Sequence, residues 1–200
     1  MGIRAVGFLK AKDMKTDVNT FLNNFREGLF SLGSFGFDNW RCRIDKFVSN
    51  NPNNSNNNSG LIDAIVKLIT FSDTNEVIVE NSNEILISDS SFTGFLHNVG
   101  LSKKIQICRI EGSMAQLGDF KVRYGAVYNQ SFTGILFDIE YLPVNLLTSN
   151  FKPLFDSVIS MMSESNQTPI ELLLPEEPNV EFSFKHLGQL YFQIKDLFSS

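Results

Sequence analysis

The sequence is poor in the residues that build most catalytic and metal sites. Its 200 residues include two His and two Cys, and neither type occurs in a close spacing such as H-x-x-x-H or C-x-x-C that would gather metal ligands. The phosphate-binding motif G-x-x-x-x-G-K-[ST], the dinucleotide-binding motif G-x-G-x-x-G and the G-x-S-x-G nucleophile elbow are all missing. An enzyme is therefore the minority interpretation, and we expect no cofactor and no metal ion.

Basic charge is also scarce. The chain has 17 Lys and Arg against 22 Asp and Glu, a formal net charge of −5. A domain that holds nucleic acid through its phosphates carries a basic excess on at least one face. The nearest candidate is a group on neighbouring predicted strands, formed by Lys103, Lys104, Arg109, Lys121 and Arg123. We interpret this group as a solvated strand face, and we expect no direct binding of nucleic acid.

Long apolar runs are missing as well. No stretch approaches the ~18 consecutive apolar residues of a transmembrane helix, and the start M-G-I-R-A-V lacks the pattern of a signal peptide. We therefore expect neither a membrane partner nor a secretory leader. Cys42 and Cys108 stand in separate apolar strand patterns, which favours two buried free thiols over a disulfide framework.

Phenylalanine is the residue in excess, with 19 Phe against one Trp and four Tyr. So many Phe side chains can fill the interior of a curved or closed sheet. We also expect some aromatic surface to be exposed, and therefore a partner that covers it. Asparagine dominates residues 50–60, which read N-N-P-N-N-S-N-N-N-S-G. This stretch cannot bury enough apolar area to offset its ordering entropy. We expect a disordered loop inserted into one domain that spans residues 1–200.

Apolar periodicity predicts many antiparallel strands with helices at both ends. The first half should contain a strand over Ile3–Leu9, a helix capped by Thr16 or Asp17 and running to about Leu32, a strand from near Phe37, and strands over Ala64–Phe71, Glu76–Glu80 and Glu84–Ser88. A short helix to about Val99 and a strand over Ile105–Ile110 should follow. Two helices should end the chain, one carrying the stripe from Phe151 to Met162 and one near Lys185–Phe198. The polar turns S-D-T-N and N-S-N make the middle strands a meander. The predicted class is α+β.

The segment Asp119–Val144 is the clearest structural pattern, because each half alternates apolar and polar residues at period two. One face of its two strands carries Phe120, Val122, Tyr124 and Ala126, and then Ile135, Phe137, Ile139 and Tyr141. An isolated hairpin is marginal in water, so other strands and the helices must cover this face. The pattern predicts a mostly antiparallel sheet, curved into a barrel-like core with flanking helices.

The letters of this hairpin resemble those of one protein family. The hairpin reads D-F-K-V-R-Y-G-A-V followed by G-I-L-F-D-I-E-Y. It resembles the hairpin of the Mediator head-module subunit 20 family, also called TBP-related-factor-proximal proteins. That family's pattern is D-F-x-V-(R/K)-x-G-x-V … (R/K)-G-(I/L)-x-(V/I)-E-(V/L/I)-x-Y. Matching positions include Asp119, Phe120, Val122, Gly125, Val127, Gly134 and Tyr141. Thr133 departs from the pattern, which has a basic residue there, and the Asn-rich insertion is not a general family feature.

This resemblance implies a non-catalytic subunit of the Mediator transcriptional coactivator, located in the nucleus, which bridges regulators to RNA polymerase II at promoters. It also implies a heterodimer with the similarly folded subunit 18 and contact with the C-terminal helix of subunit 8. Two alternatives stay open from the residues alone. A small-ligand-binding β-barrel would suit the Phe-rich interior, and a hydrolase or transferase would need His97 or His186 beside a nucleophile in a pocket.

Five residues are candidates for partner contacts. Phe35 and Phe37 stand at a predicted turn, where burial is less assured. Leu136, Asp138 and Glu140 lie on the hairpin face opposite the apolar row. We expect these three side chains to point outward, away from the barrel interior.

Overall fold

The structure, a computed structural model, describes residues 1–48, 65–82, 84–101, 103–148, 151–163, 170–175 and 179–197. The predicted Asn-rich loop at 50–60 lies outside the described residues. The described strands are β1 (Ile3–Lys10), β2 (Phe35–Val48), β3 (Val66–Phe71), β4 (Glu76–Asn81), β5 (Glu84–Asp89), β6 (Lys103–Leu117), β7 (Phe120–Asn129), β8 (Ser131–Tyr141) and β9 (Leu172–Leu173), and the helices are η1 (Ala11–Asp13), α1 (Val18–Ser31), α2 (Phe92–Asn98), α3 (Phe151–Ser163) and α4 (Phe184–Leu197). None of these helices is long and apolar enough to cross a membrane.

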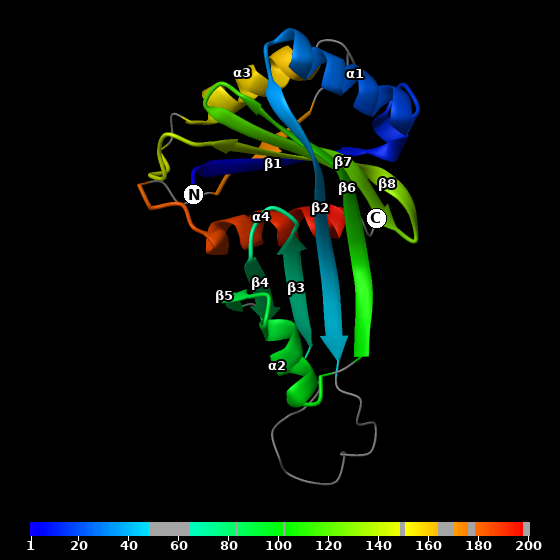
Figure 1. The fold of residues 1–200 in the computed structure, drawn as a ribbon, viewed down its shortest axis with the longest axis vertical. Coiled ribbons are helices and arrows are strands. Elements are labelled where there is room, and N and C mark those ends of the chain that lie inside the picture. The colour runs from blue at the N-terminus through cyan, green and yellow to red at the C-terminus, as the bar shows by residue number, and fades with distance from the viewer. Residues whose placement is uncertain are drawn as a thin grey trace.

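All nine described strands join one sheet in the order β5-β4-β3-β2-β6-β7-β8-β1-β9. Every neighbouring pair is antiparallel. The two longest strands, β2 and β6, form the middle of the sheet, which curves into a half-barrel around α4 (Figure 1). The predicted class, α+β with a curved antiparallel sheet and flanking helices, is confirmed.

Helix α1 begins and ends where the sequence predicts. The Asp17 carboxylate accepts hydrogen bonds from the backbone N–H groups of Asn19, at 3.0 Å, and Thr20, at 3.1 Å. These bonds satisfy donors that the first turn of a helix leaves without partners. Gly33 follows the helix with φ +85°, a left-handed conformation that glycine adopts without strain.

The apolar stripe of α1 packs on the outer face of the sheet. Phe21, Phe25 and Leu29 are buried, and the Phe25 ring centroid lies 4.8 Å from that of Tyr124 and 5.1 Å from that of Phe137. Helix α3 lies beside α1, so the two cover the part of the sheet that contains β7, β8 and β1 (Figure 1). The hairpin's apolar row is therefore buried, as its alternation predicts.

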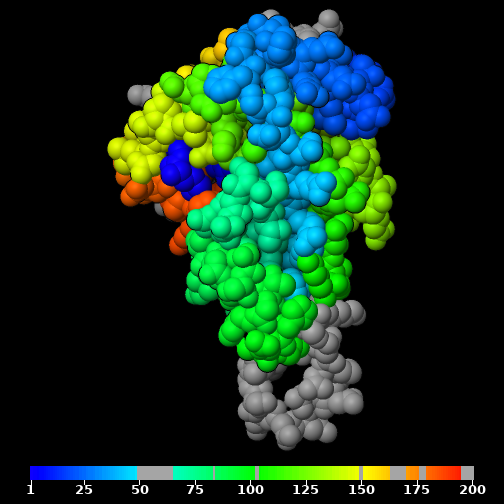
Figure 2. Space-filling model, viewed as in Figure 1, coloured from blue at the N-terminus to red at the C-terminus, as the bar shows by residue number. Residues whose placement is uncertain are grey.

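A second, smaller core lies at the other end of the outer face. Its buried residues come from β2, β3, β4 and α2 with the loop that follows it, and are Phe47, Val66, Leu68, Val77, Val79, Leu96 and Leu101. Helix α2 supplies the cover there. Between α1 and α2, residues of β2 and β6 reach the surface (Figure 2). The outer face is thus covered at both ends, with a surface of β2 and β6 residues between the helices.

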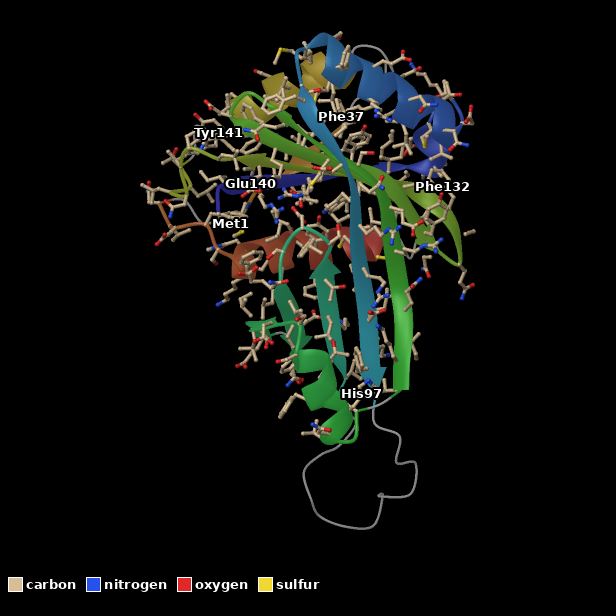
Figure 3. All side chains as sticks on the ribbon, viewed as in Figure 1. Met1, Phe37, His97, Phe132, Glu140 and Tyr141 are labelled. Carbon is tan, nitrogen blue, oxygen red and sulfur yellow. The ribbon has the colours of Figure 1, made fainter. Side chains whose placement is uncertain are left out.

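Two expectations need correction. Leu136, Asp138 and Glu140 are buried instead of outward, because α4 covers the concave face of the sheet; Figure 3 shows Glu140 between the strands and α4. Strand β6 also continues to Leu117 instead of ending at Ile110. It pairs with β2 on one side and β7 on the other, and these two ladders extend it through a Gly-Ser step of low β-propensity.

The packing of α1 predicts different costs for two phenylalanines on one helix. Phe25→Ala should lower the free energy of unfolding by about 3–5 kcal/mol, because it opens a cavity under the helix. Phe30→Ala is the matched control, since Phe30 is 72% exposed, and should change stability by less than about 0.5 kcal/mol. Urea unfolding of the three proteins measures both values. Equal losses would contradict the described packing of α1.

Candidate functional site

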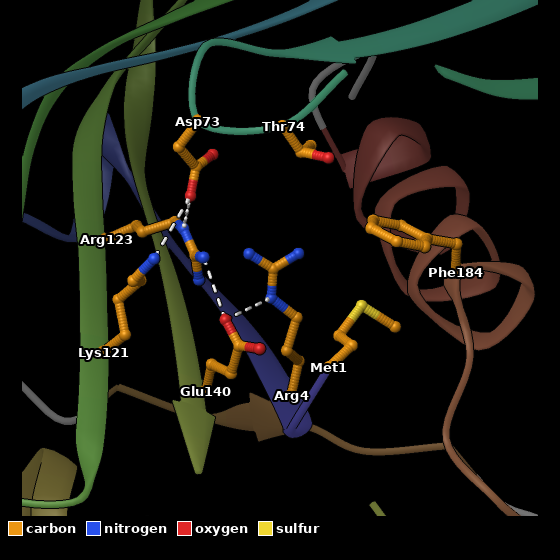
Figure 4. A pocket seen from close by; sticks show the side chains of 8 residues that line it. All are labelled: Met1, Arg4, Asp73, Thr74, Lys121, Arg123, Glu140 and Phe184. Carbon is orange, nitrogen blue, oxygen red and sulfur yellow. Dashed lines mark hydrogen bonds and ion pairs between the residues drawn. The ribbon is translucent and has the colours of Figure 1, made fainter. Parts of the chain in front are cut away.

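Five charged side chains meet on the concave face of the sheet, and we call them the ion cluster: Arg4, Asp73, Arg123, Asp138 and Glu140. Figure 4 shows Arg4, Asp73, Arg123 and Glu140 from close by. Strand register brings four of them together. Arg4 of β1 lies directly opposite Glu140 of β8, and Arg123 of β7 lies directly opposite Asp138 of β8. Asp73 comes from the turn between β3 and β4. The antiparallel pairing therefore builds the cluster from four segments of the chain.

Arg123 is the centre of the ion cluster, and its side chain is only 3% exposed. Its Nε donates to Asp73 Oδ2 at 2.8 Å, and its Nη2 donates to Glu140 Oε2 at 2.9 Å. Its Nη1 lies 3.4 Å from Asp138 Oδ1. Arg4 is the second cation, with Nε 3.2 Å from Asp138 Oδ1 and 3.5 Å from Glu140 Oε2. The two guanidinium groups thus share the carboxylates of β8.

The remaining carboxylate oxygens accept hydrogen bonds from outside the cluster. Tyr191 of α4 donates its hydroxyl to Asp138 Oδ2 at 2.7 Å, and Trp40 Nε1 lies 3.2 Å from Asp73 Oδ1. The Gly2 N–H donates to Glu140 Oε1 at 2.9 Å. Buried charges are tolerated when they are paired and their other lone pairs are satisfied. The ion cluster therefore fastens α4 and the N-terminal segment to the sheet.

The ion cluster lowers the pKa of two of its carboxylates and raises that of the tyrosine bonded to it. Desolvation raises the pKa of Asp73, but attraction to Arg123 and the hydrogen bond from Arg123 outweigh it, so the net pKa is lowered. Glu140 follows the same pattern, with Arg4 and Arg123 outweighing desolvation. Burial raises the pKa of Tyr191 well above its usual value, and the Asp138 charge raises it further. The two carboxylates stay ionised and Tyr191 keeps its proton at neutral pH.

A cavity of about 190 Å³ opens beside the ion cluster (Figure 4). It is lined by Met1, Thr74, Lys121 and Phe184 together with Arg4, Asp73, Arg123 and Glu140. This volume is below the ~300–1,000 Å³ of typical small-molecule sites, and the charged groups in its wall are already paired with one another. The small-ligand alternative therefore gains no support here.

The two histidines have structural surroundings. His186 Nδ1 accepts the backbone N–H of Ser183 at 3.1 Å and lies 3.0 Å from Ser183 Oγ, an arrangement like a capping box at the start of α4. The His97 ring lies edge-on to Phe47, with centroids 5.9 Å apart. Within the described ranges, no three His, Cys, Asp or Glu side chains gather so as to hold a metal ion. These contacts give the hydrolase alternative no support.

The predicted basic group is divided between environments. Arg123 is buried in the ion cluster, Lys121 lies at its rim with Nζ 3.9 Å from Asp73 Oδ2, and Lys104 and Arg109 are exposed on the outer face. The interpretation as one solvated face is therefore wrong for Arg123. Sequence reasoning also missed Arg4, Asp73 and Tyr191 as members of the site. The predicted hairpin register held one usable signal, since it sets Arg123 against Asp138.

The predicted partner residues lie in two places. Phe35 is 61% exposed at the start of β2, and Phe37 is half-buried with the Arg26 guanidinium 5.1 Å from its ring centroid. Phe30 and Leu32, in the last turn of α1 and just after it, are exposed too. We call Phe30, Leu32 and Phe35 the apolar turn surface. The other three predicted residues, 136, 138 and 140, contact the chain itself beneath α4.

The fold is an α+β half-barrel, and the ion cluster holds parts of this fold together. Comparison with known proteins then identifies the family. The family model for "TATA-binding related factor (TRF) of subunit 20 of Mediator complex" matches residues 1–194. The chain belongs to this family and is therefore a Mediator complex subunit with a role in transcription regulation, as the hairpin resemblance indicates.

Two of the solved structures that match share little sequence with this chain. The PH1012 protein from Pyrococcus horikoshii OT3 is 14% identical, with 86% of this chain and 94% of that one covered and a TM-score of 0.40. The PH1819 protein from the same organism is 9% identical, with 94% and 98% covered and a TM-score of 0.38. No curated protein matches the sequence. The family assignment thus stands on the family match.

The ion cluster predicts unequal effects for two cations on the same strand. Arg123→Leu should lower the free energy of unfolding by about 3–5 kcal/mol, because it leaves buried carboxylates without their partner. Lys121→Leu is the control two residues away, where the side chain is 34% exposed, and should cost less than about 1 kcal/mol. Urea unfolding measures both, and a loss at position 123 no larger than at position 121 would contradict the central role of Arg123.

The lowered pKa values of Asp73 and Glu140 predict acid sensitivity. Their usual values are 3.8 and 4.5, and the folded values lie below these. A carboxylate with a depressed folded pKa stabilises the fold above its unfolded pKa, and this stability is lost as the pH falls through the folded pKa. The free energy of unfolding should thus decrease below about pH 5. Urea unfolding across this range tests the decrease, and Glu140→Gln should flatten it.

Proposed function

We propose that this chain is a non-catalytic structural subunit of the Mediator head module, acting in the nucleus as part of a coactivator that bridges regulators to RNA polymerase II at promoters. The family match over residues 1–194 carries this proposal. The ion cluster supports it, since its charges are paired within the chain and hold α4 in place. A catalytic acid, base or nucleophile would instead need a reactive group directed at a substrate site.

The proposed partners are Mediator subunit 18, as a heterodimer, and the C-terminal helix of subunit 8. The apolar turn surface supports a protein contact, because exposed aromatic side chains are the usual anchors of interfaces. Phe35 is its predicted member, and Phe37 lies beside it in sequence. Contact with residues 136, 138 or 140 would require α4 to leave the concave face. We therefore confine the proposed contact to the turn between α1 and β2.

Affinity purification tests this proposal. The tagged chain should recover Mediator subunits, including subunit 18, from nuclear extract of its source cells. The double substitution F30D/F35D should reduce that recovery about tenfold or more, since it buries carboxylates in an apolar interface. Leu86→Asp is the control, because Leu86 is also exposed but lies on β5.

Failure to recover any Mediator subunit with the unsubstituted chain would overturn the proposed assembly. Equal recovery with F30D/F35D and with Leu86→Asp would overturn the proposed surface alone. Circular dichroism of each variant establishes that it is folded before its recovery is compared. The two outcomes therefore separate membership of the complex from the location of the contact.

A further inference from the structure

Basic side chains gather on the outer face of β2 and β6, between α1 and α2. We call Arg41, Arg43, Lys104 and Arg109 the outer basic patch. All four are exposed, in a chain whose formal net charge is −5. The acidic side chains among them are Asp45 and Glu111, so that four cations face two carboxylates. The patch thus has a formal charge of about +2 against the sign of the whole protein.

The strand register places like charges together in this patch. Arg43 of β2 lies directly opposite Arg109 of β6, and their side chains are 47% and 46% exposed. Arg41 shares the outer face, two residues before Arg43 along β2. Like charges directly opposite on neighbouring strands destabilise a sheet. The Arg43–Arg109 pair therefore costs the fold some stability, which the carboxylates of the patch offset in part.

Contacts within the patch orient these cations. The buried Asp45 carboxylate binds two of them through Oδ2, with Arg43 Nε at 3.2 Å and Lys104 Nζ at 2.8 Å. Arg109 Nε lies 3.7 Å from Glu111 Oε1, and its guanidinium lies 5.2 Å from the centroid of the Tyr128 ring. Groups held in place before binding lose less entropy when a ligand arrives.

We propose that the outer basic patch binds an acidic peptide segment of a partner protein. Guanidinium groups bind carboxylates with two parallel hydrogen bonds. The side chains on one face of an extended peptide recur about every 6.6 Å, and neighbouring strands of the sheet lie about 4.8 Å apart. The spacing of two or three carboxylates along an extended segment is therefore similar to the spacing of the cations on β2 and β6.

A peptide fits this patch better than a nucleic acid. Nucleic acid carries continuous phosphate charge, which would run beyond four cations onto a protein of net charge −5. A short acidic segment can end where the patch ends. The proposal deepens the proposed function by giving the chemistry of one partner segment, but its test needs only the isolated full chain. Failure of the patch and failure of the Mediator assembly are therefore distinguishable.

Fluorescence polarisation with a labelled peptide of alternating Glu and Ser tests the patch. The substitution R43Q/R109Q should weaken binding about tenfold, as expected for the loss of two charge-assisted contacts. K12Q/K185Q is the matched control, because it removes the same charge from exposed lysines of η1 and α4, and should change the affinity by less than about twofold. Binding should also weaken from about 0.01 M to about 0.15 M salt, where the Debye length falls from about 30 Å to about 8 Å.

Four further measurements test the patch. R43Q/R109Q should stay folded, as circular dichroism can establish, because Lys104 still pairs with the buried Asp45 carboxylate, so lost binding would not reflect lost folding. If that variant fails to fold, Arg41→Gln replaces it, with weakening of about threefold expected. Equal affinity for a peptide of alternating Gln and Ser, or equal loss in K12Q/K185Q, would overturn the proposal. Tighter binding of single-stranded oligothymidine would replace the peptide with nucleic acid.

Discussion

The buried guanidinium of Arg123 is the constraint on which the rest of the structure depends. A cation removed from water is strongly destabilising unless carboxylates surround it, and here the carboxylates come from the turn after β3 and from β8. The same carboxylates bind Arg4 of β1 and Tyr191 of α4. Attraction to them raises the pKa of Arg123 despite its desolvation, so the charge persists. The cluster thereby links the turn after β3 with β7, β8, β1 and α4 on the concave face.

Because the ion cluster lies inside the half-barrel, the concave face and the outer face of the sheet differ in what they can contact. The concave face is filled by α4 and the ion cluster, and both faces of β8 are buried. Surface available to partners therefore lies elsewhere, at the apolar turn between α1 and β2 and on the outer face of β2 and β6. One is aromatic and the other cationic, so they suit partners of different chemistry.

The sequence predicted the elements well because their signals are local. The Asp17 cap, the glycine after α1 and the period-two alternation of β7 and β8 act within a few residues. Alternation also predicted correctly that residues 136, 138 and 140 share a face. It gave a wrong orientation for them, since alternation sorts residues into two faces without indicating what covers either. The prediction that Arg109 and Arg123 share one solvated face was wrong for the same reason.

The sequence by itself therefore determined the strands, the helices and the hairpin letters that mark the family. Tertiary structure decided which charges are buried and which are exposed. The bond from Arg123 to Asp73 spans 50 residues of chain, and that from Tyr191 to Asp138 spans 53. Periodicity reaches no further than one element, whereas burial depends on which distant segment covers a face. Only the folded sheet, with α4 on one side and the gap between α1 and α2 on the other, could separate the ion cluster from the outer basic patch.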